Sequence, residues 1–199
     1  DIGLIPTIGE WVLREACAEA AQWPDDIKVA VNLSPVQFRS RNLTQIVLSA
    51  LAQSGLSPTR LELEITESIF LAETETNLAT LHRLREFGVR ISMDDFGTGY
   101  SSLSYLRSFP FDKIKIDRSF VRDLSERPDC VAIVRAISGL GRSLNISTTA
   151  EGVETMDQLD TLRAEGCTEV QGFLFSAARP AEEVRTLLKK FGERASRAA

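Results

Sequence analysis

The sequence predicts an α/β fold of parallel strands and crossover helices, and a (β/α)8 barrel of the TIM type fits it best. The first observation is a regular alternation of strand-like and helix-like segments, which requires parallel strands joined by helices. The second is that polar residues follow the end of every predicted strand. A doubly wound sheet also satisfies the alternation, but it focuses its site at one switch point. Polar residues at all the strand ends therefore favour the barrel.

Each element is predicted from its spacing of apolar residues and from the residues that bound it. The predicted strands cover residues 28–33, 60–66, 89–93, 112–116, 146–150 and 168–170. The predicted helices cover residues 7–23, 43–54, 74–87, 102–108, 129–144, 155–165 and 181–191. Capping boxes at Thr7 with Glu10 and at Thr155 with Gln158 mark two helix starts. Gly88 can adopt the left-handed conformation that ends a helix.

Length and composition indicate one globular domain, predicted over residues 1–191, with a C-terminal tail at 192–199. The net charge of -5 argues against a polymeric nucleic acid as partner, although bound cations could still attract a small phosphorylated ligand. Cys17, Cys130 and Cys167 are scattered, which indicates reduced thiols and a cytoplasmic location rather than disulfides or a zinc site. No apolar run reaches the roughly 20 residues of a membrane span, so no membrane segment is predicted.

The polar residues at the strand ends are mostly acidic. In chain order they are Asn32, Glu64, Glu67, Asp94, Asp95, Lys115, Asp117, Glu151, Glu154 and Gln171. So many carboxylates at one rim repel one another, and divalent cations such as Mg²⁺ or Mn²⁺ relieve that repulsion. Two such ions can hold a phosphodiester and activate water, so the residues predict a metal-dependent phosphodiester hydrolase. Taken singly, an acidic residue here is more commonly a helix N-cap, and Arg60 and Glu62 are predicted to face outward or toward the bottom of the barrel.

Six ordered motifs resemble those of the EAL domains, a family of cyclic di-GMP phosphodiesterases. They are VNLS at 31–34, EITES at 64–68, DDFGTGY at 94–100, KIDR at 115–118, EGVE at 151–154 and QG at 171–172. The resemblance extends from about Asp1 to Val184. It implies a modified (β/α)8 barrel that hydrolyses cyclic di-GMP to linear pGpG with two Mg²⁺ or Mn²⁺ ions.

The resemblance also implies a role for each residue at the rim. The implied metal ligands are Asn32, Glu64, Asp94, Asp95 and Asp117. Lys115 would hold the attacking water, and Glu151 would orient or deprotonate it. Glu154 would support the metal site, and Gln171 would contact the substrate. Glu67 would brace the loop from Phe96 to Ser102, which in this family links the metals to the dimer interface.

The sequence departs from the family pattern at its start. Family members carry two further strands, the second bearing the Glu-Ala/Val-Leu motif and a phosphate-binding arginine. We therefore expect this chain to lack two strands of the barrel and to be inactive alone.

Two alternatives to an enzyme stay open at this point. The first is a catalytically silent cyclic di-GMP receptor, although the chain keeps every metal ligand that its length permits. The second is an interaction module that binds no nucleotide. The family also implies a homodimer and, in many members, an upstream sensory or GGDEF domain.

Overall fold

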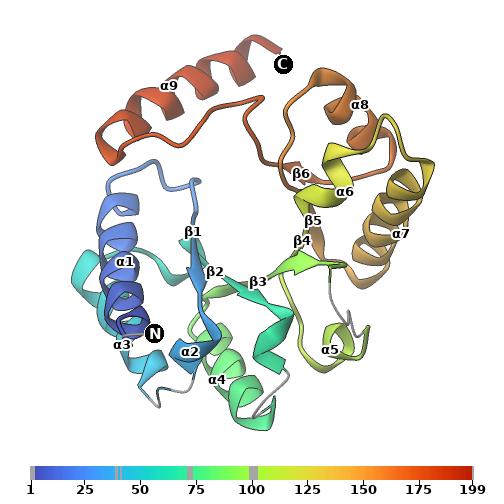
Figure 1. Cartoon of the computed structure of the whole chain (residues 1–199). Coiled ribbons are helices and arrows are strands. Elements are labelled where there is room, and N and C mark those ends of the chain that lie inside the picture. The colour runs from blue at the N-terminus through green and yellow to red at the C-terminus, as the bar shows by residue number, and fades with distance from the viewer. Residues whose placement is uncertain (1–2, 39, 41, 71–73, 99–102, 199) are drawn as a thin grey trace.

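A computed structural model describes residues 3–38, 40, 42–70, 74–98 and 103–198. Its centre is one curled sheet of six parallel strands, each paired with the strand before it in the chain (Figure 1). The strands are β1 Val29–Leu33, β2 Leu61–Thr66, β3 Arg90–Phe96, β4 Lys113–Ile116, β5 Ser147–Ala150 and β6 Glu169–Val170. This arrangement confirms the predicted alternation of strands and helices.

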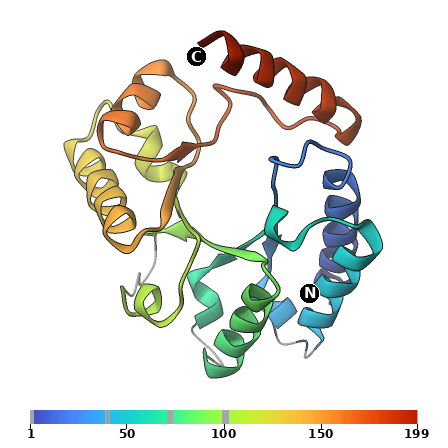
Figure 2. The ribbon, with the colours of Figure 1, turned by 180° about the vertical axis from the view of Figure 1, so that it is seen from behind.

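Helices surround the convex side of the sheet (Figures 1 and 2). They are α1 Ile5–Ala20, α2 Pro35–Phe38, α3 Leu43–Ser54, α4 Thr74–Glu86, α5 Leu103–Ser108, α6 Arg118–Arg122, α7 Pro128–Leu144, α8 Met156–Ala164 and α9 Ala181–Ala198. Two 3-10 turns, η1 Pro58–Arg60 and η2 Glu67–Phe70, flank β2. Both views show the segment after β6 crossing to the α1 side of the ring, where α9 begins and Arg185 hydrogen-bonds Gln22, and α9 then runs back toward α8. Within the described residues, no helix is long and apolar enough to cross a membrane.

The core lies between the sheet and the helices. On β2 the side chains of Leu61, Leu63 and Ile65 are fully buried. Side chains alternate along a strand, so Glu62 and Glu64 lie on the opposite, inner face. The apolar face of each strand therefore packs on the helices, and the inner face is left to polar groups.

The structure changes several predicted boundaries. The capping box predicted at Thr7 and Glu10 is wrong, because α1 begins at Ile5 with Pro6 in its first turn and no side-chain cap. Pro6 suits a first helical turn, where its missing N–H leaves no hydrogen bond unmade. Glu10 instead pairs with Arg14 across one turn, at 2.8 Å. The second box is confirmed, since Thr155 and Gln158 cap α8 reciprocally.

Two elements are longer than predicted. β3 continues to Phe96, so Asp94 and Asp95 lie within the strand rather than after it. α9 continues beyond Phe191 to Ala198. The predicted left-handed glycine at Gly88 is confirmed, with φ 93°.

Candidate active site

The side chain of Lys115 lies at the centre of the rim residues. β4 carries it on the inner face of the sheet, where it is only 4% exposed. Its Nζ lies 2.7 Å from Glu64 Oε2, 3.0 Å from Asp94 Oδ1 and 2.6 Å from Glu151 Oε1. One ammonium thus joins carboxylates from β2, from β3 and from the residue that follows β5.

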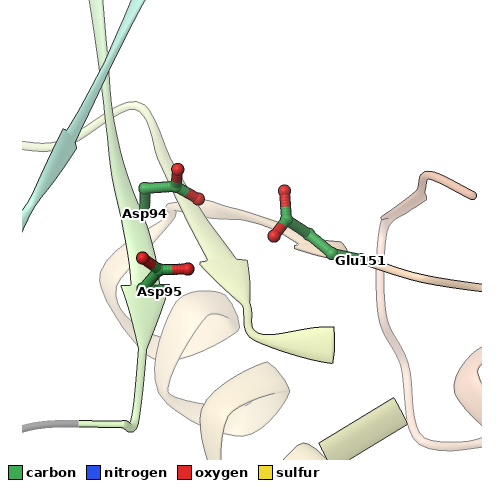
Figure 3. A group of neighbouring side chains, drawn as sticks. All are labelled: Asp94, Asp95 and Glu151. Carbon is green, nitrogen blue, oxygen red and sulfur yellow. The ribbon is translucent and has the colours of Figure 1, made fainter. Parts of the chain in front are cut away.

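Asp94, Asp95 and Glu151 form a compact group of acidic ligands. One carboxylate oxygen from each lies within 4.8 Å of the others. Figure 3 shows Asp94 and Asp95 projecting from β3 toward the carboxylate of Glu151. Asp94 Oδ1 is buried and accepts no hydrogen bond, although Lys115 is close by. Oxygen ligands at this spacing suit a hard divalent cation.

The backbone at Asp95 is unusual for a residue with a side chain. Its φ of 52° places it in the left-handed region, which costs a non-glycine residue free energy and is found mainly at functional sites. Desolvation raises the pKa of the Asp95 carboxyl, and the neighbouring charges of Asp94 and Asp117 raise it further. A cation bound beside Asp95 would lower the pKa of this carboxyl again, because its positive charge favours the ionised form.

The two predicted catalytic groups have shifted pKa values. Burial opposes protonation of Lys115, but hydrogen bonds to Glu151 and Glu64 outweigh it and raise the pKa of the ammonium above its usual range. Burial raises the pKa of the Glu151 carboxyl, against the opposing effect of Lys115. Lys115 is therefore a permanent cation at neutral pH, whereas Glu151 is a stronger base than an exposed carboxylate.

The remaining predicted metal ligands lie around this group. Asn32 is exposed on the inner face of β1, and its Cα pairs in register with Glu64. Asp117 accepts hydrogen bonds from the backbone amide of Ser119 at 2.9 Å and from its hydroxyl at 2.5 Å. Asp117 is therefore the N-cap of α6, the role that a single acidic residue after a strand most commonly has. Its charge also raises the pKa of Asp95.

The two predicted supporting residues are Glu67 and Glu154. Glu67 begins η2 and is half-buried, and the loop it was expected to brace includes residues 99–102, outside the described residues. Glu154 is exposed, and its backbone amide donates to Gln158 Oε1 at 2.8 Å. Together with Asp117 and Arg118 it lines a cavity of about 580 Å³.

Gln171 lies at the mouth of a second cavity of about 570 Å³, which also reaches Glu64 and Lys115. Its backbone amide donates to Ala150 O at 2.8 Å, which fixes it beside the end of β5. Phe173 and Phe175 line the same cavity with 71% and 42% of their surface exposed. Sequence reasoning missed both. The available signal was a pair of aromatic residues at alternating positions directly after the QG motif, and exposed aromatic faces can stack on bases.

Glu62 was predicted to face outward or toward the bottom of the barrel, and the structure excludes the outward orientation. Glu62 is 2% exposed and lies on the inner face of β2, one step below Glu64. Arg60 does lie at the bottom, where its Nε donates to Ile27 O at 2.8 Å and its Nη2 to Ala20 O at 2.7 Å.

Comparison with known proteins agrees with this geometry. Residues 1–178 match the family model described as the EAL domain. The chain belongs to the EAL domain family. An uncharacterized protein, y4lL of Sinorhizobium fredii, is 56% identical over 97% of the chain and 23% of its own length. The bifunctional diguanylate cyclase/cyclic di-GMP phosphodiesterase MucR of Pseudomonas aeruginosa is 47% identical over 92% of the chain and 27% of its own length.

Solved EAL structures share the fold. The MucR phosphodiesterase in complex with cyclic di-GMP matches with a TM-score of 0.87 at 47% identity, over 92% of this chain and 75% of that one. A manganese and cyclic di-GMP complex of Klebsiella pneumoniae BlrP1 matches with a TM-score of 0.80 at 33% identity, over 86% of this chain and 44% of that one. The predicted class, an α/β fold of the TIM-barrel type, is confirmed. The EAL chain spans about a quarter of the length of these curated relatives.

Proposed function

We propose that this EAL chain forms the catalytic part of a metal-dependent phosphodiesterase that hydrolyses cyclic di-GMP to linear pGpG. The observation that carries the proposal is the Lys115 ammonium held among Glu64, Asp94 and Glu151. That cluster opens into the cavity that contains Gln171. The printed names of MucR and of its cyclic di-GMP complex support the choice of substrate.

The residues at the rim fit a pair of Mg²⁺ or Mn²⁺ ions. The acidic group Asp94, Asp95 and Glu151 has ligand spacing, and the buried Asp94 Oδ1 lies 3.0 Å from Lys115 Nζ. The residues that would hold the ions are Asn32, Glu64, Asp94, Asp95 and Asp117. When bound, the ions would neutralise phosphate oxygens and lower the pKa of a nearby water. The manganese complex of BlrP1 supports this choice of cation.

Lys115 and Glu151 would handle the water. Because its pKa is raised, Lys115 stays charged, so it donates hydrogen bonds and cannot act as the base. Glu151, whose pKa is raised by burial, takes the proton from the attacking water. The water oxygen bonds to phosphorus, the bond from phosphorus to the ribose 3′ oxygen breaks, and that oxygen takes up a proton. The product carries a 5′ phosphate and a 3′ hydroxyl, as in pGpG.

The residues around this pair would position the substrate. Gln171, at the mouth of the cavity, would contact the nucleotide, and the exposed rings of Phe173 and Phe175 offer flat faces for its guanine bases. Glu154 would support the metal site from its position after β5, and Glu67 would brace the loop that follows β3.

The test is incubation of the full-length protein with cyclic di-GMP and Mg²⁺ or Mn²⁺, with pGpG measured by chromatography. We expect pGpG to form and its formation to stop in excess chelator. Retention of cyclic di-GMP without turnover would instead identify a receptor. Turnover that persists in chelator would reject the metal mechanism, and absence of both binding and turnover would reject the function.

Assembly beyond this chain stays a prediction. The printed name of MucR combines two activities in one protein, and this chain covers only a quarter of it. We propose that the full-length protein carries an upstream sensory or GGDEF domain and forms a homodimer, as the family resemblance implies. Its mass in solution, measured by light scattering, tests the dimer.

A further inference from the structure

A second tier of charged side chains lies inside the sheet, directly below the candidate active site. Glu62 on β2, Lys113 on β4 and Glu169 on β6 each precede a rim residue by two positions. Residues two apart share a strand face, so these side chains point into the same cavity as Glu64, Lys115 and Gln171. Glu62, Lys113 and Glu169 take no part in the proposed reaction.

Lys113 connects the other two members of this lower tier. Its Nζ lies 2.9 Å from Glu62 Oε1 and 2.8 Å from Glu169 Oε2. Glu169 Oε2 also accepts a hydrogen bond from the Thr149 hydroxyl at 3.1 Å. A second cation, Arg90, approaches Glu62 only to 3.6 Å. Lys113 is therefore the closer partner of Glu62 and the link from β2 and β4 to β6.

The link is buried at its Glu62 end and partly exposed at its Glu169 end. The side chain of Glu62 is 3% exposed and that of Lys113 is 15% exposed, whereas the Glu169 side chain is 45% exposed. Burial opposes the charge on Lys113, but hydrogen bonds to Glu169 and Glu62 raise the pKa of its ammonium overall. Burial likewise opposes the charge on Glu169, yet Lys113 lowers the pKa of that carboxyl overall. Lys113 and Glu169 are thus both ionised near neutral pH.

β6 is the last strand of the described sheet. It is two residues long and ends the sheet, so among the described strands it pairs only with β5. The register joins Thr149 to Glu169 and Ala150 to Val170. Gln171 follows immediately, and the exposed Phe173 comes two residues later. The backbone of Gln171 is held by hydrogen bonds to Ala150 O and from Val153 N, and the ion pair at Glu169 adds a side-chain tether at the start of the substrate-facing segment.

We propose that Lys113 is a positioning residue for cyclic di-GMP binding, which holds β6 through Glu169 and so places Gln171 and Phe173 at the rim. This inference rests on the proposed function. Lys113 acts on the nucleotide-binding side of the cavity and not on the water, since Lys115 and Glu151 keep their own contacts without it. Its loss therefore affects KM much more than kcat.

The test compares variants of the full-length protein by steady-state kinetics with cyclic di-GMP and Mn²⁺. Lys113→Met keeps the aliphatic stem and removes the charge, and we expect KM to rise about 10-fold with kcat within about 3-fold. Lys113→Arg can restore both ion pairs and should return KM to within about 3-fold of wild type. Lys190→Met, an exposed lysine on α9, is the matched control and should leave both constants unchanged.

Glu169→Gln separates positioning from direct contact between Lys113 and the substrate. Positioning predicts that Glu169→Gln raises KM as Lys113→Met does, and that the double variant is no worse than either single one. Direct contact predicts that Glu169→Gln leaves KM unchanged or lowers it, because the ammonium is released. Glu169→Gln also serves if Lys113→Met fails to fold, since it leaves Lys113 paired with Glu62.

Failure of this inference differs from failure of the proposed function. Wild-type turnover with an unchanged KM in folded Lys113→Met and Glu169→Gln would overturn the positioning role alone. If Lys113→Met lowers kcat and raises KM by similar factors, and Lys113→Arg restores neither constant, then Lys113 only stabilises the fold and does not position the substrate. Should the wild type bind cyclic di-GMP without turnover, the dissociation constants of the same variants replace KM. Absence of binding by the wild type would overturn both.

Discussion

Gly172 is a position where the structure leaves no room for a methyl group. A Cβ built there would lie 2.1 Å from Val153 O and 2.3 Å from Val153 N. Ordinary contacts begin near 3.4 Å, so the two backbone segments would have to separate by about 1.3 Å. That movement breaks hydrogen bonds from Val153 N to Gln171 O and from Leu174 N to Val153 O, both 3.0 Å long.

We expect Gly172→Ala to destabilise the protein by about 3–5 kcal/mol. Overpacking costs about 1–3 kcal/mol, and each lost hydrogen bond about 1 kcal/mol. For a chain of this size, each kcal/mol lowers Tm by about 2–4 °C. Urea unfolding and calorimetry measure both quantities. Because Gln171 is the preceding residue, KM for cyclic di-GMP should rise in the same variant.

Gly139 provides the matched control. It lies inside α7, and a Cβ built there meets nothing within 4 Å. Gly139→Ala should therefore stabilise the protein by about 0.5–1 kcal/mol, since alanine suits a helix better than glycine. The reasoning is refuted if Gly172→Ala unfolds at the wild-type midpoint, or if the two alanines have the same effect.

Two further predictions concern ionisable groups. Glu151→Gln and Lys115→Ala should each lower kcat by at least about 10²-fold in the Mn²⁺ assay, the scale of general acid–base groups, and near-normal turnover would remove that residue from its role. Burial raises the pKa of the Cys17 thiol to about 11, so at pH 8 only about one thiol in a thousand is ionised. Iodoacetamide should therefore spare Cys17 at pH 8 in the native protein and label it in urea, and rapid native labelling, read by mass spectrometry, would contradict the buried position.

The repeating pattern was predictable because local signals agreed with the tertiary structure. The box at Thr155 and Gln158 formed because nothing competes with it. The same motif at Thr7 and Glu10 did not form, because Pro6 and the apolar residues before it extend the helix toward the N-terminus. Two matching residues define a possible cap, but flanking residues decide whether the helix starts there.

The orientation of Glu62 could not be predicted from β2 alone. Alternation separates Glu62 and Glu64 from Leu61 and Leu63, but it does not say which face meets the helices. The assumption that charge faces water fails in a sheet whose outer face is covered by helices. The cation that neutralises Glu62 is Lys113, about fifty positions along the chain, and only the folded sheet brings the two together. The ion pairs of Lys115 could not be predicted either, because their partners Glu64, Asp94 and Glu151 are far from Lys115 in the sequence.

The order of the strands has a consequence for how the protein is made. Each strand pairs with the one synthesised just before it, so the sheet can grow from its N-terminal edge as the chain leaves the ribosome. Once β4 has emerged, Lys115 can already pair with Glu64 and Asp94. Glu151 and then Gln171 arrive last. The nascent domain therefore acquires the Lys115 ammonium before Glu151, and repulsion among Glu64, Asp94 and Asp95 is partly neutralised before that carboxylate joins them.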